Sequence, residues 1–99
     1  MSFQAVRDSA LRSLAPNPFR AFTEVQFTLG AESSVDLDVF DVLGRSVRSV
    51  AHGERLAAGE HALRWDGVDH DGHVSGAGVY FVRLRAGTAS VTRAVVRVR

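Results

Sequence analysis

Apolar and polar residues alternate with a period of two along most of the 99-residue chain. The clearest run spans residues 23–29, where Thr23, Val25, Phe27 and Leu29 alternate with Glu24, Gln26 and Thr28. This period is typical of a strand with one buried and one solvated face. Similar runs recur at residues 35–42, 59–65, 79–85 and 92–99, and shorter candidates lie at residues 11–15 and 46–51. Together they predict an all-β antiparallel sandwich of about seven strands, without a helix.

Residues 42–45 carry the signal of a tight hairpin. Gly44, in the sequence Val42-Leu43-Gly44-Arg45, can take the positive φ that short turns require. We expect residues 46–51 to form a short return strand, followed by a polar connection at residues 52–58.

The stretch from Trp65 to Leu84 holds the only Trp, the only Tyr and four of the nine Gly. Because Trp65 ends one predicted strand and another begins at residue 78, the segment between them is expected to be a hairpin-like connection. Trp65 and Tyr80 are expected to pack in the core, since flanking strands of a sandwich usually bury such side chains. The alternative is an aromatic platform for carbohydrate. Four glycines are expected to serve the backbone geometry of this stretch and the preceding hairpin: Gly44, Gly67, Gly72 and Gly78.

The N-terminal part divides at two prolines. Pro16-Asn17-Pro18 fixes φ twice and removes two amide donors, so we expect an extended, kinked entry to a domain that spans residues 16–99. Residues 1–15 are interpreted as a lead-in that could link to a preceding domain. Within it, Val6, Ala10, Leu11 and Leu14 could line one side of a short helix, whereas residues 11–15 fit an edge strand. We favour the strand because the residue before a Pro is biased towards extended geometry.

Length and composition narrow the class of protein. Ninety-nine residues with 45% apolar and 23% charged side chains fit one folded domain. No apolar run approaches the roughly 18 residues that cross a bilayer, so membrane insertion is not expected. Four charged residues interrupt the first 22 positions, which argues against a signal peptide there. The chain has no Cys, and a net charge of +1 is too small to suggest nucleic acid as a partner.

Charge is distributed unevenly along the chain. The last acidic residue is Asp71, whereas five arginines follow it: Arg83, Arg85, Arg93, Arg97 and Arg99. On two adjacent strands without a counter-charge these cations would repel one another by a few tenths of a kcal/mol per facing pair. Such arginines are usually a solvated strand face, and this cost leads us to predict instead a docking surface for an acidic partner.

Two groups of residues suggest a metal site, and both are weak. Asp66, Asp69 and Asp71 lie before Gly72, yet their spacing departs from a calcium loop, and turn-forming carboxylates that accept their own backbone amides are the favoured interpretation. The four His, at positions 52, 61, 70 and 73, lack ligand spacing for a transition metal. No Ser lies in a nucleophile elbow, so we expect no cofactor and no enzymatic activity.

Several short sequences together match a known family. They are Val39-Phe40-Asp41-Val42-Leu43-Gly44-Arg45, Ala58-Gly59-Glu60-His61, Trp65-Asp66-Gly67-Val68-Asp69, Gly72 and Gly78-Val79-Tyr80-Phe81-Val82-Arg83-Leu84. Over residues 27–87 this combination resembles the Ig-like domain of flagellar hook-capping proteins, a pattern that recurs in C-terminal modules of exported bacterial proteins. The resemblance implies an Ig-like or fibronectin-III-like sandwich.

Two further segments resemble the opening and closing boxes of type IX secretion sorting domains: Pro16-Asn17-Pro18, and the basic strand at residues 92–99. The closing box of that family usually carries Lys, whereas this one carries only Arg. This resemblance implies a non-catalytic C-terminal sorting or anchoring module of an exported protein, monomeric in isolation and recognised by the secretion machinery or by neighbouring domains. A chain that ends with this strand fits the sorting family better than a hook cap. The alternatives are a hook-cap-like assembly domain and an accessory carbohydrate-binding module.

Overall fold

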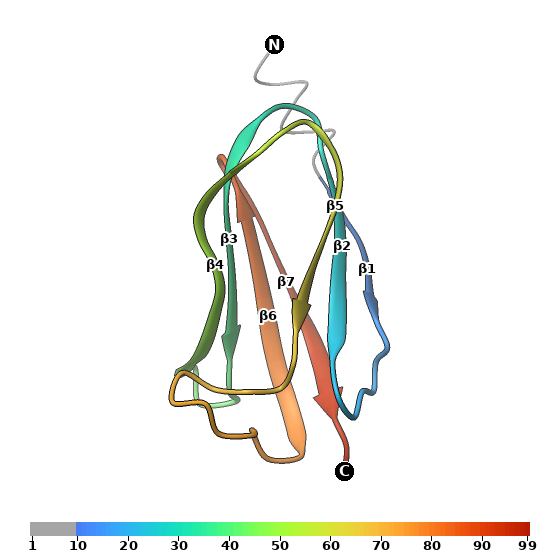
Figure 1. Ribbon diagram of the computed structural model, residues 1–99, viewed down its shortest axis with the longest axis vertical. Helices are drawn as coiled ribbons and strands as arrows, with labels where there is room; N and C mark the ends of the chain where they lie inside the picture. Colours follow the sequence, from blue (N-terminus) through green and yellow to red (C-terminus); the bar gives the residue numbers. More distant parts are fainter. Residues whose placement is uncertain (1–9) are drawn as a thin grey trace.

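A computed structural model describes residues 10–99 as two packed antiparallel sheets (Figure 1). The strands are β1 Ala10–Ala15, β2 Thr23–Leu29, β3 Ser33–Phe40, β4 Ser46–Leu56, β5 Gly59–Trp65, β6 Gly78–Ala86 and β7 Ala89–Arg97. One sheet has the order β1-β2-β5 and the other the order β4-β3-β6-β7. The predicted seven-stranded sandwich is confirmed. No helix long and apolar enough to cross a membrane occurs in the described part of the chain.

The period of two accounts for the core. Alternate residues of β2, β3 and β6 point between the sheets, where they are almost fully buried: Val25, Phe27, Leu29, Val35, Leu37, Val39, Val82 and Leu84. Each such side chain stabilises the fold by roughly 1.5–3 kcal/mol through removal of apolar surface from water. In β7 the sequence has valines on both faces, and the structure buries Val95 completely while Thr92 and Ala94 stay exposed.

β1 belongs to the sandwich, so the predicted domain boundary at residue 16 lies too far along the chain. It pairs with β2, with Leu11 opposite Phe27 and Leu14 opposite Val25. The edge-strand interpretation of residues 11–15 is therefore confirmed. Of the expected lead-in, residues 1–9 lie outside the described residues.

β4 is longer than the predicted return strand. It runs for eleven residues to Leu56, through most of the segment expected to be a polar connection. Beyond Ala51 both faces of this edge strand are largely exposed, so the alternation that marks a half-buried strand disappears. At Gly53, with a φ of +62°, the backbone N–H donates to Asp36 Oδ1 at 2.8 Å beside an irregularity in the β3–β4 register.

Residues 66–77 do not form the predicted hairpin-like connection. β5 pairs with β2 in one sheet, whereas β6 pairs with β3 and β7 in the other. This segment, called the crossing loop below, therefore carries the chain between the sheets along the lower end of the molecule in Figure 1. The predictions of a strand before and after this segment were correct. The local sequence, however, does not specify the sheet in which each strand pairs.

Candidate functional site

The acids of the crossing loop hold their own backbone. Asp69 Oδ1 accepts the N–H of Asp71 at 2.9 Å and that of His73 at 3.0 Å, and Asp66 Oδ1 accepts the N–H of Val68 at 3.1 Å. The hydrogen bond from the His73 backbone is the main cause that lowers the pKa of Asp69. The favoured interpretation of these carboxylates as turn formers is confirmed for Asp66 and Asp69.

The weak metal candidate set is rearranged by the fold. Asp69, Asp71 and His73 each offer a ligand atom, and these atoms lie within 4.8 Å of one another, whereas Asp66 is not in that group. Calcium takes six to eight oxygen ligands. Because Asp69 Oδ1 already accepts two amides and Asp71 and His73 are exposed, we assign no metal to this loop.

Trp65 is a core residue. Only 1% of its surface is exposed, and its Nε1–H donates to the Val68 carbonyl at 3.0 Å. Its ring lies edge-on to Phe19 at 5.4 Å and to Tyr80 at 5.3 Å, while the Tyr80 hydroxyl donates to the Gly76 carbonyl at 2.7 Å. The carbohydrate-platform alternative is therefore wrong for Trp65, since a buried indole offers no stacking face.

Two glycines show why the backbone needs them. Gly44 has a φ of +80° in the β3–β4 turn, where Asp41 Oδ1 accepts the N–H groups of Leu43 and Arg45. Gly67 has a φ of +76°, and a Cβ on it would approach Arg97 Nε to 3.1 Å. The other two predicted positions also have positive φ: Gly72 at 84° and Gly78 at 146°.

The five C-terminal arginines do not form one uncompensated surface. Arg83 and Arg85 point outward from β6, and their guanidinium groups lie 3.5 Å from Asp38 and 3.8 Å from Asp36. The acids come from β3, which pairs with β6 in register, so the expectation of strands without a counter-charge is wrong for this pair.

The remaining three lie elsewhere. Arg93 is on the edge strand β7 at the rim of a groove of about 240 Å³ between β1 and β7, lined also by Leu11, Phe27 and Val91. Arg97 packs against Gly67, and exposed Arg99 follows the end of β7. The set predicted from sequence is thus divided among an outer sheet face, a groove and one end of the sandwich.

A contact that the sequence did not reveal joins the segment Pro16-Asn17-Pro18 to the basic strand at the end of the chain. Asn17 Oδ1 accepts the N–H of Val96 at 3.0 Å, and Asn17 Nδ2 donates to the Ala94 carbonyl at 3.3 Å. Next to it, Phe19 N–H donates to the Val96 carbonyl at 2.9 Å, and Val98 N–H donates to the Phe19 carbonyl at 2.8 Å. We call this contact between residues 16–19 and residues 94–98 the clamp. The only local signal for it was an amide side chain placed between two prolines.

The buried anchor of the clamp is Phe19, which is 1% exposed and packs on Trp65. Thr23, at the start of β2, adds a second tie, because its hydroxyl donates to the Pro16 carbonyl at 2.8 Å. The clamp therefore fastens the free edge of β7 to the turn between β1 and β2.

Residues 20–90 match the FlgD Ig-like domain family. This chain belongs to that family. The FlgD Ig-like match runs from just after Phe19 to the first residues of β7, so most of the clamp lies outside it. Among curated proteins, no sequence matched this FlgD Ig-like domain significantly.

Three solved structures share its fold. Dimeric latent PorU from Porphyromonas gingivalis aligns with a TM-score of 0.69 at 20% identity, over 87% of this chain and 9% of that protein. PorZ, described as an essential bacterial surface component of the type-IX secretion system of the same organism, aligns with a TM-score of 0.63 at 18% identity, over 97% and 12%. FLGD from P. aeruginosa aligns with a TM-score of 0.59 at 22% identity, over 90% and 64%. The chain thus spans a small fraction of the first two proteins and just under two thirds of the third.

Proposed function

We propose that this FlgD Ig-like domain is a non-catalytic module of an exported bacterial protein that acts in type IX secretion as a sorting or anchoring domain. It would work through protein–protein recognition, by the secretion machinery or by neighbouring domains. The clamp is the observation that carries the proposal. It joins the two segments that resemble the opening and closing boxes of sorting domains, although Asn17 and Val96 are 79 residues apart.

The position of the clamp supports a role in recognition. Most residues of the clamp lie outside residues 20–90, the part of the chain that matches the family. The clamp is therefore an addition to the part that defines the family fold. The structural likeness to PorU and PorZ agrees with this proposal at the level of the fold. Under this proposal the protein is located at the cell surface or outside the cell.

Two acidic side chains of the turns support the fold. Backbone hydrogen bonds from Arg45 and His73 lower the pKa values of Asp41 and Asp69. Each carboxylate is thereby held in its charged form to stabilise a turn.

Export of a reporter tests the proposed function. A reporter that carries a signal peptide and is fused to the full 99-residue chain should reach the medium or the cell surface in a host with type IX secretion, and should remain periplasmic in the same host without a working system. Asn17→Ala should reduce export, because it removes both side-chain bonds to β7. Gln26→Ala is the matched control, since it removes an exposed amide whose bonds reach only Ser13 and Glu24. Export that is independent of the secretion system would refute the sorting role.

A hook-cap-like assembly domain is the second candidate, and the family match at residues 20–90 favours it. The test is to exchange this domain for the Ig-like domain of a hook-capping protein and to count assembled hooks. Normal hook growth with the exchanged domain would support assembly, whereas a stable but inactive chimera would count against it.

A further inference from the structure

One end of the sandwich carries the large apolar side chains that the described chain leaves exposed. They are Val42, Leu43, Val74 and Val79, which are between 41% and 75% exposed. They come from the β3–β4 turn, the crossing loop and the start of β6, which lie together at the lower end of Figure 1. The end of β7 and the turn after β1 reach the same place. We call this region the distal end, because β1 begins at the opposite end of the molecule.

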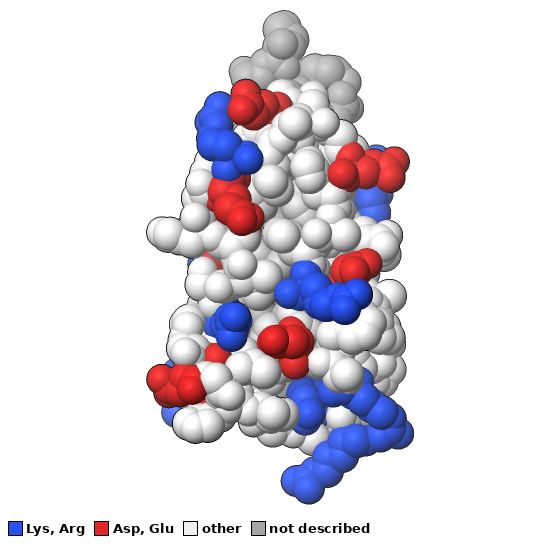
Figure 2. Space-filling view, viewed as in Figure 1, with Lys and Arg blue, Asp and Glu red and all other residues white. Residues whose placement is uncertain are grey.

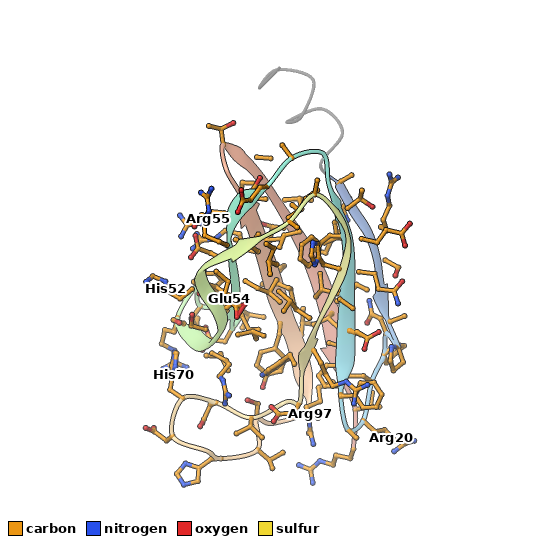
Figure 3. The ribbon with its side chains drawn as sticks, turned by 45° about the horizontal axis from the view of Figure 1, so that its top comes forward. Arg20, His52, Glu54, Arg55, His70 and Arg97 are labelled. Carbon is orange, nitrogen blue, oxygen red and sulfur yellow. The ribbon has the colours of Figure 1, made fainter. Side chains whose placement is uncertain are left out.

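The arginines without a partner also gather at the distal end. Within residues 10–99, the side chains of three arginines make no hydrogen bond and no ion pair: Arg20, Arg97 and Arg99. Arg20 follows Phe19, which bridges to Arg97, so the clamp brings the turn and the end of β7 side by side. Figure 2 shows basic side chains together at the lower right, with an acidic patch just above them, and Figure 3 labels Arg20 and Arg97 at this end.

Arg97 has terminal guanidinium nitrogens that make no hydrogen bond or ion pair within residues 10–99. Its side chain lies against Gly67 and near Phe19, and its Nε is buried without an acceptor, so a partner can reach only the terminal nitrogens. A buried donor without an acceptor destabilises the folded state, and a guanidinium offers paired N–H groups that match a carboxylate. Among the acids of the crossing loop, Asp66 is the one next to Gly67 in the sequence. Its Oδ1 accepts the Val68 N–H, and it lines a different pocket, together with Arg48 and Arg64.

Apolar contacts border the charges. Val79, which is 41% exposed, lies opposite Val96 in the β6–β7 pair, one position from the Gly78–Arg97 pair. Exposed apolar side chains beside arginines are typical of protein interfaces, in which Arg is enriched. The molecule measures 44 × 22 × 20 Å, so the distal end is only about 20 Å across. That size fits a peptide segment better than a standard interface, which buries about 800 Å² per partner.

We infer that the distal end is a docking site for an acidic peptide segment of another protein, with Arg97, Arg20 and Arg99 as its carboxylate contacts and Val79 as an apolar contact. Charge complementarity selects the acidic partner, because within residues 10–99 no carboxylate forms an ion pair with these three side chains. The apolar side chains and a net charge of only +1 favour peptide over nucleic acid or a polyanionic glycan. The inference rests on the proposed function only in taking the partner to be a protein.

Fluorescence anisotropy with a labelled hexapeptide of alternating Glu and Leu tests the site on the full 99-residue chain at low salt. We expect saturable binding that weakens with added NaCl, and little binding of the corresponding Gln–Leu peptide. The triple variant Arg20→Gln, Arg97→Gln and Arg99→Gln should weaken binding at least about tenfold, as expected when hydrogen bonds to charged groups are lost.

The matched control is the triple variant Arg12→Gln, Arg55→Gln and Arg85→Gln. It removes the same number of positive charges at positions away from the distal end and should change the affinity less than about twofold. The double variant Arg20→Gln and Arg99→Gln touches only exposed residues, so it reports on the site even if loss of Arg97 unfolds the protein. Equal losses in both triple variants, no binding by the unmodified chain, or tighter binding of a sulfated oligosaccharide at the same residues would overturn the inference. Because this assay uses purified protein, its failure leaves the export result unchanged.

Discussion

The crossing loop and the clamp lie at the same end of the sandwich and are held together in different ways. In the crossing loop, Asp66 and Asp69 accept amides only two or four residues away. In the clamp, Asn17 and Phe19 bind backbone groups of β7 that are almost the whole chain distant. The loop is thus a locally closed structure, whereas the clamp exists only after both sheets have formed.

This difference teaches where function is expected. A loop whose carboxylates are already occupied by their own amides has little left to offer a partner. The clamp instead brings Arg20 beside the end of β7 and leaves three guanidinium groups unpaired. The carboxylates of the crossing loop, which suggested a metal site in the sequence, therefore maintain the fold. The unpaired arginines at the distal end are the residues that we infer to take part in recognition.

The largest expected effect comes from removing the side chain that both regions share. Trp65→Ala should destabilise the domain by about 3–5 kcal/mol, because it empties the space between Phe19 and Tyr80. Urea denaturation followed by far-UV circular dichroism measures the change. An alanine variant with an unchanged midpoint would show that Trp65 does not join the two regions.

Gly67→Ala tests the contact between the crossing loop and the end of β7. A residue with a side chain at this positive φ costs about 1–2 kcal/mol, and the new Cβ would also crowd Arg97. Gly44→Ala is the control, because Gly44 has a similar φ of +80° and nothing within 4 Å of the added atom. Denaturation midpoints should show a larger loss for Gly67→Ala. Equal losses would mean that backbone strain alone accounts for both.

Asn17→Ala should loosen the clamp without unfolding the sandwich. Two exposed hydrogen bonds to β7 are lost, at a cost of about 1 kcal/mol. Amide hydrogen exchange should become faster at Val96 and Val98, while amides in the centre of β3 keep their protection. Asn17→Asp retains the acceptor for Val96 N–H and should lie between the two. Uniform acceleration over the whole domain would instead indicate that the clamp is part of one cooperative unit.

The smallest expected effect is a pH dependence in the crossing loop. Backbone hydrogen bonds lower the pKa of Asp69 below its ordinary value of 3.8, so the folded state binds its proton less readily than the unfolded state. Its contribution to stability is complete above the unfolded pKa and is lost as the pH falls through the folded one. The melting temperature of Asp69→Asn should therefore fall less than that of the unmodified chain between about pH 5 and about pH 2. Glu54→Gln, an exposed acid on β4, is the control. Identical acid profiles for all three proteins would contradict this role of Asp69.

Particular residues show how far sequence reasoning reached. Val25 and Phe27 alternate with polar neighbours, so their strand and its buried face followed from periodicity alone. The Asx turns at Asp66 and Asp69 also followed, since their bonds span two to four residues. β4 was cut short at Ala51, because an edge strand with two wet faces has no alternation to detect. The crossing loop was mistaken for a hairpin, because its flanking strands carry no label for the sheet that each one joins.

The sequence by itself determined most of the strands, the Asx turns and most of the core, because period-two burial and short-range hydrogen bonds depend on neighbouring residues. Only the tertiary structure decided which arginines have partners. Arg83 meets Asp38 because β6 lies beside β3, whereas Arg97 lies against Gly67 with no acceptor for its Nε. Ion pairs form between residues that are distant in the chain. A run of basic residues in the sequence therefore shows how much positive charge is present, whereas the fold determines whether that charge is paired.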